Sequence, residues 1–339
     1  MRPAHRRLGH PLVAGLSWVV AFGLSLSAPL WAGDTSAQAR AIINRMSLAA
    51  RTLNYKGTFV YLRGSHAISM QVIHKAEADT EQERLISLSG PAREVIRKNG
   101  EVTCIFSDNR AIMVDKTPPH RLLASTLPQP IEKIADLYSF SVLGSDRIAG
   151  RPAWVLGIVP KQPDRYGYRL WIDKSLHLLL RSNVIDASGT VLEQVLFTAI
   201  DTPQHIADEE VLKPSISGQG YTWYTNEPSV SAGASAKPGQ WQIGWLPQGF
   251  TVQDQGVQAM AASREPVSHM LISDGLATVS VFVERFTGKT DRIEELSSVG
   301  AVNTYSTVAH GYQITGVGEV PAATLRQIAD SVTDLPKSP

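Results

Sequence analysis

Short apolar runs separated by turn residues recur from residue 57 to residue 198 and restrict this part of the chain to an antiparallel sheet. The clearest example is residues 166–198, YGYRLWIDKSLHLLLRSNVIDASGTVLEQVLFT, in which tight turns at 173–175 and 187–189 join strand-like runs. Asn99-Gly100, between two earlier runs, is the strongest short-range hairpin signal. A meander of this many strands must curl, close or split into layers.

Two helical segments accompany these strands. Residues 35–38, Thr-Ser-Ala-Gln, fit a capping box and are followed by apolar residues at helical spacing. Pro130 suits the first turn of a second helix, from which Ile131, Ile134 and Tyr138 would face inward. We expect these helices to lie on the concave side of the curled sheet and to leave an apolar interior.

The strand near residue 170 carries bulky side chains on both of its faces. Tyr168, Leu170 and Ile172 share one face with Tyr166, whereas Arg169, Trp171 and Asp173 share the other. Bulk on both sides predicts that both faces are at least partly covered. The pattern is compatible with ordinary core, with a pocket wall and with a surface for a partner.

The composition changes after residue 213. Residues 214–240 include SVSAGASAKPGQ, which is small, polar and typical of a linker. The following residues, 241–335, predict a smaller α+β domain with a hairpin around Asp274-Gly275 and a final helix that starts at Pro321. We therefore expect an N-terminal domain over residues 33–213 and a C-terminal domain over residues 241–335.

The first 32 residues have the pattern of a secretory signal peptide, although a retained anchor is the alternative. Three arginines precede an uncharged apolar run, and Leu-Trp-Ala at 30–32 precedes the expected cleavage site. We expect the mature protein to be exported. Removing the three arginines lowers the net charge from +1 to −2, which argues against nucleic-acid binding, because that function usually needs a strong basic surplus.

The sequence contains no recognisable catalytic motif. There is no G-x-S-x-G, H-E-x-x-H or P-loop, and Cys104 is the single cysteine. We therefore expect no enzymatic activity, no metal and no cofactor. A hydrolase whose catalytic residues are dispersed along the sequence remains a third hypothesis.

Several segments, taken together and in order, resemble the RseB/MucB family of periplasmic regulators of sigma-E. They are LNYKGTFVY, GPAREVIR, YGYRLWIDKSLHLLLRSNVID followed by SGTVLEQ, WLPQGF and SDGLATVSVFVE. These segments cover both predicted domains, and the pair WLPQGF and SDGL is the most specific of them.

The resemblance implies an α+β protein with an N-terminal open antiparallel β-barrel, similar to lipoprotein carriers such as LolA, with plugging helices and a smaller C-terminal α+β domain. It also implies a function. Such a regulator binds the periplasmic part of a transmembrane anti-sigma factor (RseA/MucA-like), shields it from regulated proteolysis and is released by lipid or lipopolysaccharide acyl chains. Family members also tend to form homo-oligomers. A plain periplasmic lipid or lipoprotein carrier is the alternative that the N-terminal domain alone would suggest.

These implied functions assign candidate site residues, each of which could also be ordinary core. For the lipid-facing interior we predict Phe59, Tyr61, Met70, Val72, Leu88 and Trp171. For the surface that contacts the partner or the other domain we predict Arg169, Arg181, Trp245, Leu246, Pro247, Phe250 and Arg285.

Overall fold

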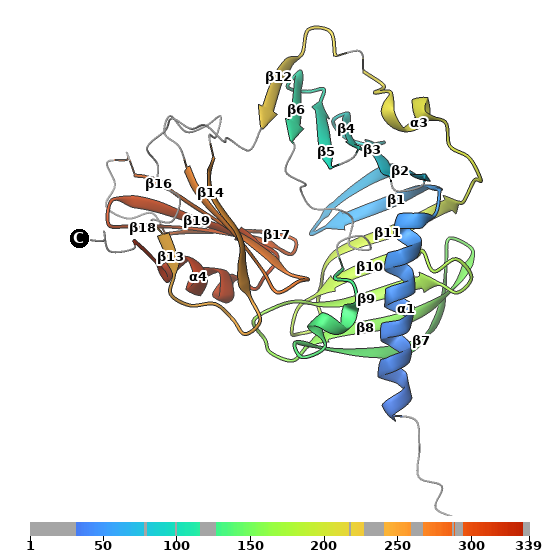
Figure 1. The fold of residues 1–339 in the computed structure, drawn as a ribbon, viewed down its shortest axis with the longest axis horizontal. Coiled ribbons are helices and arrows are strands. Elements are labelled where there is room, and N and C mark those ends of the chain that lie inside the picture. The colour runs from blue at the N-terminus through green and yellow to red at the C-terminus, as the bar shows by residue number, and fades with distance from the viewer. Residues whose placement is uncertain are drawn as a thin grey trace, which may run out of the picture.

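The computed structural model describes residues 32–334 except 78–79, 99, 116–126, 217, 227–240, 259–266, 287 and 289–293. The described residues form two domains that lie side by side (Figure 1). The predicted signal peptide lies outside the described residues, apart from Ala32.

A single large sheet dominates the N-terminal domain. Its described strands follow the order β12-β6-β5-β4-β3-β2-β1-β11-β10-β9-β8-β7, and the sheet stays open because β12 and β7 are not paired with each other. The strands are β1 (Tyr55–Arg63), β2 (His66–Glu77), β3 (Thr80–Ser87), β4 (Arg93–Lys98), β5 (Glu101–Phe106), β6 (Ala111–Asp115), β7 (Tyr138–Ile148), β8 (Arg151–Pro160), β9 (Gly167–Asp173), β10 (Leu179–Ile185), β11 (Val191–Asp201) and β12 (Thr222–Asn226). The predicted fold class, an open and mainly antiparallel sheet with few helices, is confirmed.

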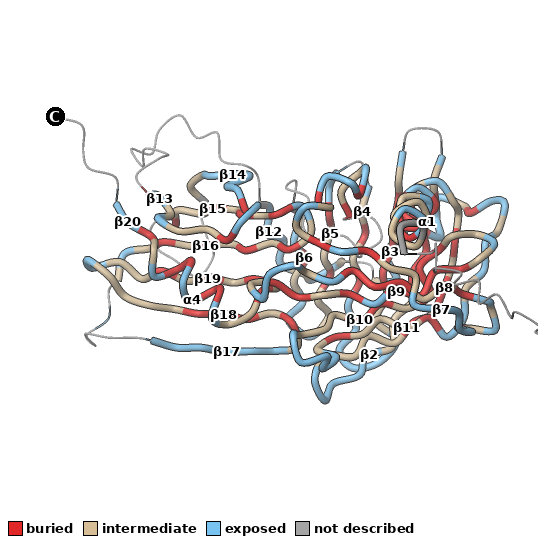
Figure 2. The backbone as a smooth tube through the Cα atoms, turned by 90° about the horizontal axis from the view of Figure 1, so that it is seen from below, coloured by how far each residue is buried: buried red, intermediate tan, exposed pale blue. Residues whose placement is uncertain are grey.

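One face of this sheet is covered by α1 (Ala32–Thr52) and by the short 3-10 helix η1 (Ile131–Ile134). Ile131 and Ile134 are buried with α1 against β7–β9, as the sequence predicts. Tyr138, which was expected on the same helix, is buried as the first residue of β7, because η1 ends at Ile134. Figure 2 shows buried positions gathering between α1 and these strands. The end of α1 reaches a second apolar cluster on the same face, which contains Phe59 and Val72. We call this side of the sheet the helix face.

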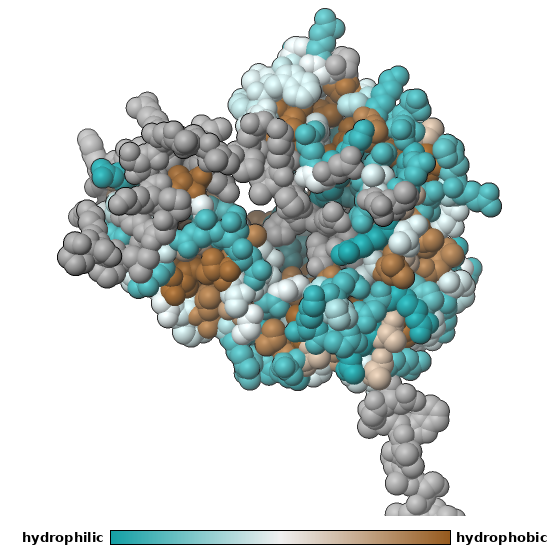
Figure 3. All heavy atoms as spheres, viewed as in Figure 1, coloured by the Kyte–Doolittle hydropathy of each residue, from teal (hydrophilic) through white to brown (hydrophobic). Residues whose placement is uncertain are grey.

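The opposite face is also covered, which agrees with the bulk predicted on both sides of β9. Trp171 packs there with Ile148 and Leu180. Further along the sheet, α3 (Asp208–Leu212) places Val211 against Ile73 of β2. Counting only the described residues, the helix face is less covered toward β4–β6, where Figure 3 shows apolar surface.

The C-terminal domain is a smaller antiparallel sheet with one helix. Its described strands follow the order β14-β15-β16-β19-β18-β17. They are β14 (Thr251–Gln258), β15 (Val267–Ser273), β16 (Thr278–Arg285), β17 (Glu295–Val299), β18 (Val302–Ala309) and β19 (Tyr312–Gly318), accompanied by α4 (Ala322–Asp330) and by the short paired strands β13 (Trp241–Ile243) and β20 (Val332–Asp334).

The core of this domain lies between α4 and one face of its sheet. The alternating valines 279, 281 and 283 of β16 are buried there with Leu325 and Ile328 of α4. The hairpin around Asp274-Gly275 and the helix that follows Pro321 are therefore confirmed. The other face of the sheet turns toward the N-terminal domain.

The structure differs from the sequence interpretation in two places. Strand β12 lies within the predicted linker, yet it pairs in parallel with β6 and so belongs to the N-terminal sheet. The rest of that linker, residues 227–240, lies outside the described residues. Helix α1 begins at Ala32, before the predicted cap at Thr35, because the residues of the capping box also continue a helix.

Candidate binding site between the two domains

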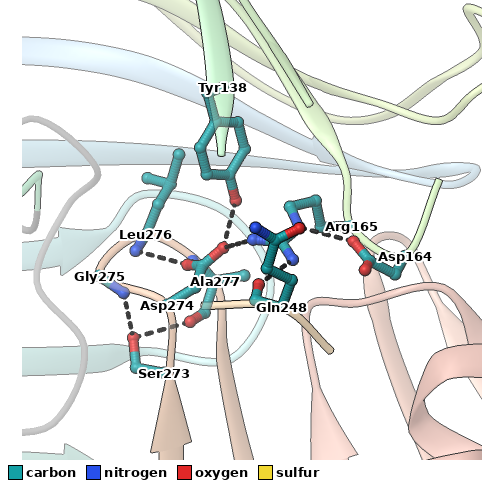
Figure 4. A network of polar contacts seen from close by, with 9 residues as sticks. All are labelled: Tyr138, Asp164, Arg165, Gln248, Ser273, Asp274, Gly275, Leu276 and Ala277. Carbon is teal, nitrogen blue, oxygen red and sulfur yellow. Dashed lines mark hydrogen bonds and ion pairs between the residues drawn. The ribbon is translucent and has the colours of Figure 1, made fainter. Parts of the chain in front are cut away.

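A buried ion pair joins the two domains. Arg165 Nη1 donates to Asp274 Oδ2 at 2.6 Å, and the hydroxyl of Tyr138 donates to the same oxygen at 2.8 Å. Arg165 Nη2 also donates to the carbonyl oxygen of Gln248 at 2.7 Å (Figure 4). We call Tyr138, Arg165, Gln248 and Asp274 the interdomain clamp, because the first two belong to the N-terminal domain and the last two to the C-terminal domain.

The charged groups of the clamp all have hydrogen-bond partners, although the ion pair is almost completely buried. The side chains of Arg165 and Asp274 are 1% and 0% exposed. The second oxygen of Asp274 accepts hydrogen bonds from the backbone N–H groups of Leu276 and Ala277, both at 2.8 Å. Burial and the neighbouring carboxylate raise the pKa of Tyr138, so its hydroxyl stays protonated and donates. A buried charge pair is stable only when such additional hydrogen bonds satisfy it.

The two most specific sequence motifs, WLPQGF and SDGL, form the C-terminal side of this contact. Gly249 has φ +84, and a Cβ built on it would lie 2.5 Å from Leu137 Cδ1 of the N-terminal domain. Arg165 lies over the ring of Phe250, with 4.9 Å from Cζ to the ring centroid. Leu276 packs against the core of the N-terminal domain. Residues of both motifs therefore contact the N-terminal domain directly and allow the two domains to pack closely.

A second contact lies at the turn between β17 and β18. Glu193 of β11 accepts a hydrogen bond from the backbone N–H of Ala301 at 2.9 Å, while Arg63 donates from Nε to the carbonyl oxygen of Val299 at 2.8 Å. Gly300 lies between them, and a Cβ there would come within 2.5 Å of both Arg63 Cγ and Glu193 Oε1. The turn thus fits against β1 and β11 only when position 300 has no side chain.

A cavity of about 590 Å³ lies between these two contacts. Its walls are the helix face of β1 and β9–β11 and the face of the C-terminal sheet that is turned away from α4. A cavity of this size is within the range of small-molecule and cofactor sites. The N-terminal domain contributes Tyr61, Tyr168, Ser182, Val184, Glu193, Gln194 and Val195, and the C-terminal domain contributes Ser273, Gly275, Leu276, Thr278, Ser280, Phe282, Val302, Val317, Gly318 and Glu319.

Two carboxylates carry the charge of the cavity wall. Glu193 is balanced by Arg63, with Nε 3.3 Å from Oε1, and by the hydroxyl of Tyr61, which donates at 2.7 Å. Among the described residues, the carboxyl of Glu319 has no hydrogen-bond or ion-pair partner. Burial, and then the charge of Glu193, raise the pKa of Glu319. The cavity is therefore acidic and lacks a cation at one of its two carboxyls.

An apolar row crosses the helix face beyond the end of α1. Directly opposed residues on successive strands form it, and its exposure rises along the row to 38% at Met113 and 49% at Tyr224. The row consists of Val72, Leu85, Val95, Cys104, Met113 and Tyr224.

The structure brings four of the six predicted lipid-facing residues together. Phe59, Tyr61, Met70 and Val72 lie in or against the apolar cluster beneath the end of α1. Leu88 follows β3 and is 52% exposed. Trp171 lies on the opposite face, where Arg181 stacks on its ring at 4.1 Å, so it does not line the helix face.

The predicted partner-binding residues are spread over several surfaces. Arg169 is exposed and lines a separate cavity of about 380 Å³ with Leu143 and Val159. Arg285 is exposed at the end of β16. The remaining predicted residues of the C-terminal domain, Trp245, Leu246, Pro247 and Phe250, are buried or half-buried, and three of them pack in or against its core. Phe250 also contacts the clamp arginine.

The sequence interpretation did not assign Arg165, Asp274, Glu193 or Glu319 to a site. Asp274 was recognised only as part of a turn and of the SDGL motif. Arg165 is 109 positions away from it along the chain, and no local pattern connects residues at that separation. The one signal in the sequence for a site at Asp274 is that an acidic residue lies inside a motif that is otherwise a simple turn.

The described residues give no indication of metal chemistry or of a membrane span. Among them, no three His, Cys, Asp or Glu side chains gather in a way that could hold a metal ion. Within the same ranges, no helix combines the length and apolar composition needed to cross a membrane.

Comparison with known proteins identifies the family. Residues 38–215 match the MucB/RseB N-terminal domain and residues 235–333 match the MucB/RseB C-terminal domain. The sigma factor AlgU regulatory protein MucB of Pseudomonas aeruginosa is 31% identical over 294 residues, which cover 86% of this chain and 89% of that protein. The sigma-E factor regulatory protein RseB of Escherichia coli is 28% identical over 301 residues, with the same coverage of 86% and 89%.

Solved structures agree with this assignment. The complex of MucA and MucB from Pseudomonas aeruginosa matches with a TM-score of 0.70 and 28% identity, covering 88% of this chain and 100% of the matched one. A crystal structure of MucB matches with a TM-score of 0.62, 28% identity and coverage of 88% and 99%. Both domains, their order and their fold are thus shared, and the chain belongs to the MucB/RseB family.

Proposed function

We propose that this protein is a periplasmic regulator that binds the periplasmic part of a transmembrane anti-sigma factor. In doing so it shields that segment from regulated proteolysis and controls the sigma-E envelope stress response. The observation that carries the proposal is the match over both domains to MucB, which has been solved in complex with MucA(peri). The protein acts by occupancy, so it needs no catalytic residues.

The interdomain cavity is the site that supports this function best. It is bounded by two sheets, offers both apolar walls and hydroxyl groups, and is held open between two defined contacts. An extended peptide segment can pass between the domains and place side chains into such a cavity. The predicted residues Tyr61 and Phe250 then act near this site, as a wall residue and as a support of the clamp.

A lipid ligand of the helix face would release the partner. The apolar row and the cluster around Phe59 offer a path for an acyl chain. Burial contributes about 0.8 kcal/mol per CH₂ group. Moving a two-state population from 1:99 to 99:1 requires about 5.5 kcal/mol of differential affinity, which about seven methylene groups could supply. The lipid must bind the partner-free form better, because only a difference in affinity shifts the population.

A reconstituted proteolysis assay tests the main proposal. The periplasmic segment of the cognate anti-sigma factor is incubated with its site-specific protease, with and without this protein. We expect the segment to be cut more slowly in the presence of the protein. Unchanged cleavage together with no measurable binding would contradict the proposal.

Lipid binding is tested separately from partner binding. Organic extracts of purified protein should contain acyl lipid, and Met113→Glu should reduce it, because a charge at the exposed part of the row opposes acyl burial. Val159→Glu is the matched control, since Val159 is exposed but lines the other cavity. Equal lipid in both variants would remove the row from the proposal. A plain lipid carrier, the alternative function, predicts transfer to an acceptor without partner binding.

The protein is also proposed to form a homo-oligomer. Strand β17 is exposed along its length at the edge of the C-terminal sheet (Figure 2), and unprotected edge strands readily pair with other chains. Light scattering coupled to size-exclusion chromatography tests this, and a monomer at all concentrations would contradict it.

A further inference from the structure

The charged groups of the interdomain cavity do not balance. Its described lining contains two carboxylates, Glu193 and Glu319, and no lysine or arginine. Arg63, which lies beside the cavity, is already engaged by Glu193 and by the carbonyl oxygen of Val299. An anionic occupant is therefore opposed by the wall, whereas a positively charged one is favoured.

The remaining wall has the chemistry of a site for a long cationic side chain. Valine, leucine and phenylalanine residues provide an apolar passage, and the hydroxyl groups of Ser182, Thr278 and Ser280 can accept hydrogen bonds from N–H groups. Lysine and arginine bury their aliphatic stems along apolar surfaces and keep the charged end at polar groups. The rings of Tyr168 and Phe282 also line the cavity, and aromatic faces attract cations.

The geometry points to this cavity as the receptor for a lysine or arginine side chain carried on an extended segment of the protein partner, with Glu319 as its counter-ion. The inference rests on the proposed function, because the anti-sigma segment supplies that side chain. It goes beyond that function by naming the chemical group that the cavity recognises and the residue that recognises it.

The titration of Glu319 gives the inference a measurable consequence. The groups that face it are Glu193, Arg63, Tyr61 and Tyr168. Burial raises the pKa of both tyrosines, so they stay neutral. Burial and Glu193 raise the pKa of Glu319, and Arg63 opposes this effect. A cation that enters the cavity favours the ionised carboxylate, so binding releases a proton and the affinity increases as the pH rises. An apolar or neutral occupant would keep Glu319 protonated and would bind better at acidic pH.

One further titratable group lies beside the wall residue Phe282, opposite it on the neighbouring strand. His269 stacks on Phe282 with 4.7 Å between the ring centroids, and burial lowers its pKa. The variant Glu319→Gln separates the two groups, because it removes the carboxyl and leaves the histidine in place. Glu295→Gln is the matched control, since it removes the same charge from the exposed strand β17 of the same domain.

The experiment is calorimetric titration of the full mature protein with the periplasmic segment of its cognate anti-sigma factor. It is done at acidic and neutral pH, in two buffers of different ionisation enthalpy. For wild type and Glu295→Gln we expect tighter binding at neutral than at acidic pH, and proton release in the pH range where the free Glu319 carboxyl is still protonated. For Glu319→Gln we expect binding about 10-fold to 100-fold weaker at neutral pH and no proton release that depends on this carboxyl.

The side chain that enters the cavity is then found by replacing each lysine and arginine of the segment with glutamine. One replacement should weaken binding to wild type but not to Glu319→Gln, because the two changes remove the same interaction. If Glu319→Gln binds the segment with the same affinity and the same proton release as the wild type, the inference is overturned and the proposed function still stands. No binding to wild type would overturn both.

Discussion

Replacing Asp274 by asparagine should destabilise the protein strongly, because it removes the buried carboxylate that the clamp arginine contacts. In the wild type, one oxygen of Asp274 accepts from Arg165 and Tyr138, and the other accepts from two backbone N–H groups. Asparagine can retain the backbone hydrogen bonds through its carbonyl oxygen. Its amide nitrogen would then face two donors, so Arg165 would stay buried without that partner.

The size of the effect follows from the burial of the pair. Breaking a buried ion pair by removing one partner costs about 3–5 kcal/mol. Arg165 keeps its hydrogen bonds to Gln248 and Asp164, so we expect a loss of about 3 kcal/mol, near the lower end. The control is Asp164→Asn, which removes the more exposed partner of the same arginine. It should cost about 1 kcal/mol or less.

Urea unfolding followed by circular dichroism measures both variants. We expect the Asp274→Asn transition to move to lower urea or to split into two, because the clamp couples the domains. Arg165→Met combined with Asp274→Asn should cost less than the sum of the single changes. The reasoning is refuted if Asp274→Asn and Asp164→Asn lower the free energy of unfolding equally.

Three other substitutions test the remaining contacts. Gly249→Ala should lower the free energy of unfolding by about 1–2 kcal/mol, because alanine would have to adopt a left-handed backbone conformation and its Cβ would press against Leu137. Gly256→Ala is the control in the same urea titration, since nothing lies within 4 Å of the added Cβ there. Gly300→Ala should disrupt the turn against β1 and β11, and a radius of gyration unchanged from wild type in solution scattering would count against this. Glu319→Gln should stabilise the protein at neutral pH but not at acidic pH. A raised pKa of Glu319 in the folded state means that the neutral carboxyl favours folding. The wild type therefore loses stability as the pH rises through the raised pKa, whereas glutamine stays neutral. Thermal unfolding across pH measures the difference, and a constant offset at all pH values would contradict the assignment.

The elements that depend on local sequence could be predicted. The alternation in β9 correctly separates Tyr168 and Leu170 from Trp171, because side chains alternate strictly along a strand. It could not indicate which side the helix covers, since that depends on where α1 packs. Trp171 was therefore assigned to the interior, although it lies on the opposite face.

The site itself depends on contacts between residues that are distant along the chain. Glu193 meets Ala301 at a separation of 108 positions, and Arg165 meets Asp274 at 109. Neither periodicity nor turn chemistry relates such residues. Glu319 becomes a cavity residue only because the C-terminal sheet docks on the helix face. The motifs WLPQGF and SDGL could be recognised, but their role in holding the domains together required the structure.

The most direct test of the account is a photocrosslink from the interdomain cavity to the anti-sigma segment. Benzoylphenylalanine replaces Ser280 in the cavity wall and, in a control variant, Val159 beside the separate cavity. With both variants binding the segment, we predict a covalent adduct from position 280 and none from position 159. An adduct from position 159 with none from position 280 would contradict the claim that the partner binds between the domains.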